Sequence, residues 1–131
     1  MSNKKFNILI VDDNKEFVGR MLGLLDELGP YLQIQTAASY PEARDQIRKN
    51  APDLVILDVR MPGNNGIELL KEIRELKTPC KVIMNTNYTH EYYKKQCIEL
   101  GASYFLDKTN DFEIVPELVR QLSMQAHENM N

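Results

Sequence analysis

The sequence predicts an α/β fold: an open, doubly wound sheet of five parallel strands with five helices. Three observations support this prediction. Short aliphatic runs alternate with longer segments whose apolar residues recur every three or four positions, as in amphipathic helices. The alternation is unbroken along the chain, which is typical of parallel strands joined by right-handed crossover helices. Five strands are too few for an eight-stranded barrel, so the sheet should be open.

Length and composition are those of one globular domain. The chain has 131 residues, of which 43% are hydrophobic and 27% charged, and its formal net charge is −3. This charge gives no electrostatic case for binding nucleic acid or an anionic membrane. No apolar run approaches the roughly 18 residues of a membrane span, and residues 1–5 lack the apolar core of a signal peptide. These features and two unclustered cysteines, Cys80 and Cys97, favour a cytoplasmic protein with free thiols.

The first two strands and helices are expected between residues 6 and 52. Residues 6–11 (FNILIV) form an aliphatic run that fits a fully buried strand. The Asp-Asp-Asn that follows can cap a helix, whose apolar face has helical spacing (Phe17, Met21, Leu24, Leu25 and Leu28). Residues 32–38 alternate in polarity, which suits a strand near the sheet edge. The second helix should begin at residues 39–41. Pro41 suits its first turn, because the N–H that proline lacks has no partner within a helix at that position.

The remaining strands and helices follow in the same order. Residues 54–58 end an aliphatic run in Asp58 and lead into a turn-rich segment, residues 59–66. We expect helices over 67–76, from Thr89 to Gly101, and from the turn before Pro116 to about Leu122. The strands between these helices are residues 81–84 (KVIM) and 103–106 (SYFL). The polar residues 123–131 should fray, so the predicted domain is residues 1–123 with a tail at 124–131.

Charged and polar residues follow the carboxyl ends of these strands, which is where open doubly wound sheets place their sites. Asp12 and Asp13 follow the first strand, Asp58 the third, Thr86 the fourth and Lys108 the fifth. Three aspartates packed together would repel one another unless a cation lay among them. Oxygen ligands with room for water suit Mg²⁺, which with the lysine would balance the three negative charges. Such a site can stabilise a phosphoryl group that is transferred to a carboxylate.

Each of these residues alone has an ordinary structural explanation. Asp12 and Asp13 suit a helix cap, Asp58 a solvated charge at a strand end, and Lys108 an exposed lysine. The prediction of a site depends on all of them falling at the predicted ends of different strands.

With these motifs in order, the chain resembles the receiver domain of bacterial two-component response regulators, in particular a stand-alone, chemotaxis-type receiver. The resemblance is carried by ILIVDDN at residues 8–14, LVILDVRMPGNNGIELL at 54–70 and GASYFLDK at 101–108, and it covers about residues 6–122. It implies a flavodoxin-like sheet with strand order 2-1-3-4-5. It also implies a cytoplasmic signalling domain, not an enzyme, that accepts a phosphoryl group from a sensor histidine kinase or a phosphotransfer protein.

The resemblance gives roles to the acidic residues. Asp58 matches the phosphoacceptor and one of the residues around the Mg²⁺ ion. Asp13 matches a direct metal ligand, and Asp12 matches an acidic partner that acts through metal-bound water. The backbone carbonyl of Arg60 matches a further metal ligand.

The resemblance also implies a switch. Lys108 and Thr86 match the residues that bind the phosphoryl group, and Phe105 matches an aromatic residue that turns inward when Thr86 moves. The surface that changes is formed by the helix after Thr89, strand 103–106 and the last helix, and it would bind a downstream protein or a second copy. We expect the outer side of the helix after Thr89 to offer contacts for that partner (Tyr92, Lys95, Gln96 and Glu99).

The sequence departs from the family in three places. Lys108 is followed by Thr109, where a proline is usual, often after a cis bond. A cis bond before another residue costs about 2.5–4 kcal/mol, which leaves open whether this bond is cis or trans and how the lysine is placed. Asn87 stands where alanine or glycine is common, and it would either crowd the phosphate or offer it a donor. Phe105 lacks a hydroxyl, and alternation should point Tyr104 to the opposite face.

Three other interpretations remain. An Mg²⁺-dependent phosphohydrolase or phosphotransferase could also use an aspartyl phosphate, but enzymes resembling haloacid dehalogenases carry an Asp-x-Asp pattern after the first strand, and this chain has Asp-Asp-Asn. A receiver that works without phosphorylation is disfavoured by the complete acidic and lysine set. A fragment of a longer regulator is weighed against a stand-alone receiver, which we favour because the chain ends soon after the last helix.

Overall fold

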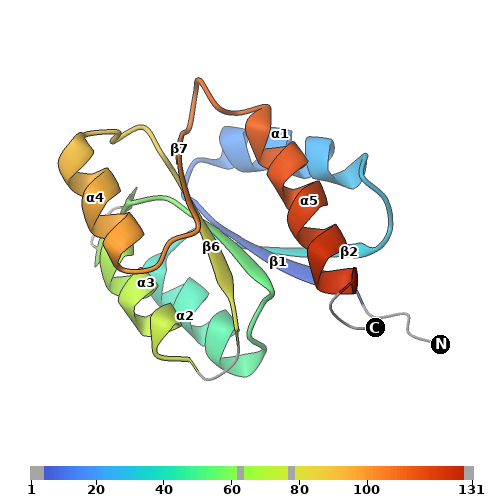
Figure 1. Ribbon diagram of the computed structural model, residues 1–131, viewed down its shortest axis with the longest axis horizontal. Coiled ribbons are helices and arrows are strands. Elements are labelled where there is room, and N and C mark those ends of the chain that lie inside the picture. The colour runs from blue at the N-terminus through green and yellow to red at the C-terminus, as the bar shows by residue number, and fades with distance from the viewer. Residues whose placement is uncertain (1–4, 62–63, 77–78, 129–131) are drawn as a thin grey trace.

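Five strands of the computed structural model form one parallel sheet, as the sequence predicts. The structure describes residues 5–61, 64–76 and 79–128. The strands of the sheet are β1 (Phe6–Val11), β2 (Leu32–Ala37), β3 (Leu54–Leu57), β6 (Lys81–Thr86) and β7 (Tyr104–Asp107). Their spatial order is β2-β1-β3-β6-β7. Numbered along the chain this order is 2-1-3-4-5, so the predicted flavodoxin-like arrangement is confirmed (Figure 1).

Helices cover both faces of this sheet. The helices α1 (Lys15–Asp26) and α5 (Ile114–Glu128) pack on one face, and α2 (Tyr40–Lys49), α3 (Gly66–Arg74) and α4 (Glu91–Glu99) pack on the other (Figure 1). Each helix turns its apolar stripe towards the sheet, which removes that stripe from water. Within the described ranges, no helix combines the length and the apolar character that a membrane span requires.

The central strands are buried on both faces, which explains their unbroken aliphatic runs. Along β1, Leu9 and Val11 join the core that lies under α2, α3 and α4, whereas Ile8 and Ile10 join the core under α1 and α5. Successive side chains of a strand point to opposite faces, so each strand feeds both cores. In β2 exposed residues alternate with less exposed ones, and its place at the sheet edge agrees with the prediction.

Side-chain caps start α1 and α2 at the predicted places. The Asn14 side chain accepts a hydrogen bond from the Phe17 N–H at 3.0 Å, and the Ser39 hydroxyl accepts one from the Glu42 N–H at 3.3 Å. Pro41 lies in the first turn of α2, where the helix needs no N–H from it. Local signals of this kind explain why most predicted boundaries lie within two residues of the observed ones.

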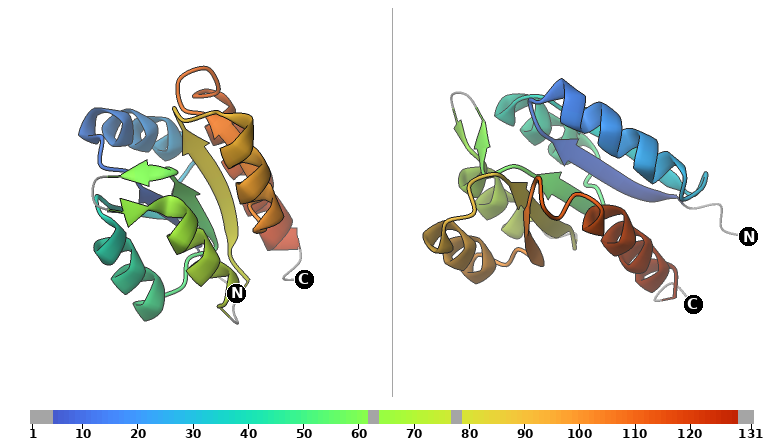
Figure 2. Two further views of the ribbon diagram at one scale, coloured as in Figure 1. Left: turned by 90° about the vertical axis from the view of Figure 1, so that its left-hand side faces the viewer. Right: turned by 90° about the horizontal axis from the view of Figure 1, so that it is seen from above.

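Two strand features differ from the prediction. β6 continues past Met84 through Asn85 and Thr86, because β7 pairs with both of these residues. The turn-rich segment after Asp58 contains a short antiparallel hairpin of β4 (Arg60–Met61) and β5 (Asn64–Asn65), which stands apart from the main sheet (Figure 2). The extension of β6 depends on its pairing with a distant segment, which the local pattern does not report.

The C-terminal helix is longer than predicted. The expected fraying from Ser123 is wrong, because α5 continues to Glu128 and so crosses the predicted boundary between residues 123 and 124. Ser123 is buried, and its hydroxyl donates to the Arg120 carbonyl at 2.9 Å, which satisfies it within the helix. Ala126 packs against the core under α1 and α5. Residues 129–131 of the predicted tail lie outside the described ranges.

Candidate functional site

Two aspartates stand side by side where β1 and β3 end. The last paired residues of these strands are Val11 and Leu57, so Asp12 and Asp58 are the next residues on two neighbouring strands. The Asp58 N–H donates to the Val11 carbonyl at 3.2 Å, and the Asp12 N–H donates to the Ala37 carbonyl at 3.0 Å. The sheet backbone therefore fixes both carboxylates at its carboxyl edge.

Lys108 reaches across from the loop after β7 and joins both carboxylates. Its Nζ lies 3.0 and 2.8 Å from the two carboxylate oxygens of Asp12 and 3.2 Å from Asp58 Oδ2. All three side chains are buried, with exposed fractions of 8%, 5% and 6% for Lys108, Asp12 and Asp58. We call these three residues the acid–lysine site.

The backbone of the loop explains how Lys108 is held. Its N–H donates to the Thr86 carbonyl at 2.9 Å. The Asp107 carboxylate accepts from the N–H groups of Thr109 and Asn110, each at 2.9 Å, and so closes the turn. The described peptide bonds are all trans, so the question left open by the sequence is answered: Lys108 reaches Asp58 with a trans bond before Thr109.

Burial and charge set the protonation of the site. Burial raises the pKa of Asp12, and the hydrogen bond and charge of Lys108 reduce that rise. Burial by itself would lower the pKa of Lys108, but its bonds to Asp12 and the charges of both aspartates outweigh burial and raise that pKa. The lysine is therefore held in its charged form, and it is the cation that lets two buried carboxylates lie together.

The third predicted aspartate, Asp13, is exposed just before α1. Lys108 contacts both Asp12 and Asp58. Within the described ranges no three acidic, histidine or cysteine side chains come together as a metal site. The donors nevertheless suit Mg²⁺, because all of them are oxygens. Burial disfavours the charged form of the Asp12 carboxylate, and a bound cation would favour that form. The Asp13 carboxylate is exposed and therefore open to a hydrated ion.

The predicted switch residues, Thr86 and Phe105, lie on the neighbouring strands β6 and β7. Thr86 is fully buried at the end of β6, and its hydroxyl oxygen accepts a hydrogen bond from the Tyr88 N–H at 3.1 Å. Phe105 is half-buried and packs against the core under α2, α3 and α4, whereas Tyr104 packs against the opposite core. The predicted alternation of these two aromatic residues is therefore correct.

Sequence reasoning missed two contacts around Lys108. The ring of Phe17, which the sequence identified only as core, lies 4.8 Å from the ammonium nitrogen of Lys108 and packs edge-on against Phe112 at 5.8 Å. The Thr109 hydroxyl donates to the Asn87 side-chain oxygen at 3.1 Å. Thr109 and Asn87 are two of the departures from the family pattern. That both positions depart from it was the signal in the sequence that could have suggested a contact between them.

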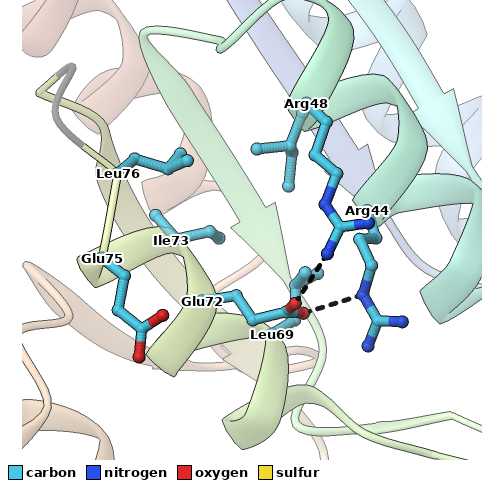
Figure 3. Close-up of a pocket in the computed structure, with 8 residues that line it drawn as sticks. Arg44, Arg48, Leu69, Glu72, Ile73, Glu75 and Leu76 are labelled. Atoms are coloured by element: carbon cyan, nitrogen blue, oxygen red, sulfur yellow. Dashed lines mark hydrogen bonds and ion pairs between the residues drawn. The ribbon is translucent and has the colours of Figure 1, made fainter.

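A hollow of about 240 Å³ between α2 and α3 is separate from the acid–lysine site (Figure 3). Across it, Glu72 pairs with Arg44 at 2.9 Å and with Arg48 at 3.4 Å, and it also accepts from the Tyr40 hydroxyl at 3.1 Å. The charges at its mouth are thus largely paired with one another, which is typical of helix packing. Its lining consists of residues from these two helices and the segment after α3 (Arg44, Ile47, Arg48, Leu69, Glu72, Ile73, Glu75 and Leu76).

The comparison with protein families agrees with this fold and with the acid–lysine site. The family model of the response regulator receiver domain matches residues 8–120, a range that includes all three residues of that site. The chain belongs to the response regulator receiver family. Receiver domains are signalling domains; in general they bind Mg²⁺ or a similar metal at the phosphorylation site and interact with histidine kinases and downstream effectors.

Individual relatives support the same assignment of this receiver domain. Protein CcdB of Bacillus subtilis (strain 168) is 35% identical over 115 residues, which cover 88% of this chain and 95% of that protein. A solved signal receiver domain of a DNA-binding response regulator (merR) from Colwellia psychrerythraea 34H has a TM-score of 0.83 and 29% identity, covering 90% of this chain and 98% of that one. A CheY-like receiver domain protein from Methanospirillum hungatei JF-1 has a TM-score of 0.82 and 25% identity, covering 95% and 99%.

Proposed function

We propose that this receiver domain accepts a phosphoryl group on Asp58 from the phosphohistidine of a sensor histidine kinase or a phosphotransfer protein. The observation that best supports this proposal is the buried contact of Lys108 with both Asp12 and Asp58. A surface ion pair could form anywhere, but a buried ammonium shared by two carboxylates is retained at a desolvation cost. Its charge is useful where a further negative charge has to be received.

The chemistry follows from the carboxylate. A bond forms between an Asp58 oxygen and phosphorus while the bond from phosphorus to the imidazole nitrogen breaks, and the imidazole leaves with the electron pair. Asp12, Asp13 and the backbone carbonyl of Arg60 would hold Mg²⁺, together with Asp58. When bound, the ion would neutralise charge on the transferring phosphoryl oxygens.

Lys108 and Thr86 supply the remaining donors. Phosphorylation of Asp58 replaces about one negative charge with about two, so the site needs additional positive charge and N–H or O–H groups. Lys108 is held protonated, and its ammonium can move to bind the phosphoryl oxygens. The Thr86 hydroxyl can leave the Tyr88 N–H and donate to a phosphoryl oxygen.

The movement of Thr86 would be transmitted to the surface formed by α4, β7 and α5. Phe105 lies half-buried in β7 and packs in the same core as α4, so it can fill space that Thr86 leaves. Cys97 is the one buried residue of α4, so little apolar contact opposes a shift of this helix. We propose that this surface binds a downstream protein or a second copy of the domain, in the cytoplasm and without direct contact with nucleic acid or membrane.

The outer side of α4 suits such a contact. Of the four predicted contact residues, Tyr92, Lys95 and Glu99 are exposed and Gln96 is half-buried. Tyr92 and Ile98 are 67% and 45% exposed, which places apolar surface where a partner could cover it.

Phosphorylation can be tested directly with a small phosphodonor. The protein is incubated with Mg²⁺ and acetyl phosphate, and intact mass is measured before and after base treatment. We expect one base-labile phosphoryl addition on the wild type and none on Asp58→Ala. No addition to the wild type, or equal addition to the variant, would refute the proposal. Sustained hydrolysis of phosphomonoesters would instead favour the phosphohydrolase interpretation, because a receiver catalyses only its own phosphorylation and dephosphorylation.

A further inference from the structure

Asn85 is a buried amide with no hydrogen-bond partner in the part of the chain that the structure describes. Its side chain is 1% exposed, and neither its Nδ2 nor its Oδ1 makes a hydrogen bond. An apolar residue of the same shape would avoid the penalty of burying two unpaired polar atoms. A polar group retained in this way requires an explanation, and its position in the sheet provides one.

Strand register places Asn85 beside Asp58. β3 and β6 pair in parallel with Leu57 opposite Met84, and one step further along both strands brings Asp58 opposite Asn85. Neighbouring strands lie about 4.8 Å apart, which is within the reach of an amide and a carboxylate.

The two side chains also share a face of the sheet. Ile83 on β6 and Ile56 on β3 both belong to the core under α1 and α5. Alternation along each strand puts residues two positions later on the same face, so Asn85 and Asp58 both lie on the side of α1 and α5. Leu106, the partner of Asn85 on β7, packs in that core as well. The amide thus flanks the acid–lysine site on the side opposite Asp12.

We propose that Asn85 is a hydrogen-bond donor that is used only when Asp58 is phosphorylated. In the structure Asp58 Oδ2 is bonded to the Lys108 ammonium at 3.2 Å. When the Lys108 ammonium moves to bind the phosphoryl oxygens, Asp58 Oδ2 loses this hydrogen-bond donor. The Asn85 side-chain N–H then donates to Asp58 Oδ2 in its place. The inference rests on the proposed phosphorylation of Asp58.

This role makes the two states respond to the amide in opposite ways. In the unphosphorylated state the amide is buried and unpaired, so it destabilises the fold. In the phosphorylated state it is paired, so the same group favours that state. A ligand or modification shifts a conformational equilibrium only through such a difference between states. Removing the amide should therefore stabilise the first state and weaken the second, whereas a residue that only packs would affect both states alike.

The test measures melting temperature with and without beryllium fluoride and Mg²⁺, which mimic a phosphoryl group on an aspartate. The variants are Asn85→Leu, which keeps the shape of asparagine, and Asn85→Val, a second apolar residue that suits a strand. Gln46→Leu is the matched control. Gln46 is the other described residue with a buried, unpartnered side-chain atom, and it lies on α2.

We expect Asn85→Leu to melt roughly 2–8 °C higher than the wild type without beryllium fluoride. We expect its apparent affinity for beryllium fluoride to fall about tenfold, which corresponds to one hydrogen bond to a charged group. Asn85→Val should show the same loss of affinity even if a smaller side chain lowers its melting temperature. Gln46→Leu should bind beryllium fluoride as the wild type does.

Two results would overturn the inference. One is unchanged affinity for beryllium fluoride in both Asn85 variants. The other is a lower melting temperature of Asn85→Leu with the affinity unchanged, which would mean that a buried water pairs the amide in the unphosphorylated state. Absence of any beryllium fluoride effect on the wild type would instead count against the proposed phosphorylation of Asp58, so the two failures are distinguishable.

Discussion

Replacing Lys108 by methionine tests whether its ammonium is what allows two buried carboxylates to lie side by side. Methionine keeps much of the length of the side chain and removes the charge. Lys108 is 8% exposed, and Asp12 and Asp58 are 5% and 6% exposed, so water screens these charges little. Because the variant leaves buried carboxylates without their partner, we expect the free energy of unfolding to fall by about 3–5 kcal/mol near pH 8.

The loss should shrink as pH falls. Burial already raises the pKa of Asp12, and Lys108 limits that rise, so the pKa of Asp12 should rise further in the variant. A carboxyl whose pKa is higher in the folded state binds a proton more tightly there, so stability falls as pH increases from its unfolded value, near 3.8, through its folded value. Acidification from pH 8 towards pH 5 should therefore restore part of the stability lost in Lys108→Met.

Urea unfolding at pH 8 and pH 5 measures this effect. The matched controls are Asp12→Asn and the double variant, because removing a buried carboxylate together with its counter-charge should restore stability. A coupling energy above about 1 kcal/mol between the two substitutions is expected for residues in direct contact. A loss below about 1 kcal/mol for Lys108→Met, equal at both pH values, would show that the ammonium does not hold the carboxylates together.

Three further predictions concern the supports of the site. Gly66→Ala places a Cβ against the Asp58 carbonyl oxygen, so thermal unfolding should show a loss of about 1–3 kcal/mol together with less phosphorylation by acetyl phosphate; a wild-type melting curve would contradict this. Asn14→Ala removes the cap of α1 and should lower stability to urea by about 0.5–2 kcal/mol, with Asn14→Ser as the conservative control. Asn87→Ala and Thr109→Val each break one 3.1 Å hydrogen bond, so each should lose about 0.5–1.5 kcal/mol and the double variant little more; fully additive losses would argue against the bond.

The parts of the site that follow directly from strand ends were predictable from the sequence. Asp12 and Asp58 each end an aliphatic run, and in a parallel sheet such ends meet at one edge. Lys108 was placed at the same edge because it follows the last strand, and its contacts with both aspartates are present in the structure. The position of Asp13 was not predictable, because the residues at the start of a helix point in different directions and only packing decides which is buried.

Contacts between loops could not be read from the sequence. Asn87 and Thr109 were identified separately as departures from the family, yet their hydrogen bond depends on how two loops, 22 residues apart in sequence, lie in space. Asn85 was expected just beyond the end of a strand, and only the pairing of β6 with β7 shows that it lies inside the sheet. The length of α5 was underestimated for a similar reason, because polar residues such as Ser123 are satisfied within the helix.

The sequence by itself determined the alternation of strands and helices, the two-faced burial of the central strands and the carboxylates at their ends. These features depend on periodicity and on the cost of burying charge, both of which are local. The tertiary structure decided which charge neutralises the carboxylates, which polar side chains are buried and which residues near the strand ends reach solvent. Those outcomes depend on distances between segments far apart in the chain, because a hydrogen bond or ion pair forms only where packing brings its two partners within a few ångströms.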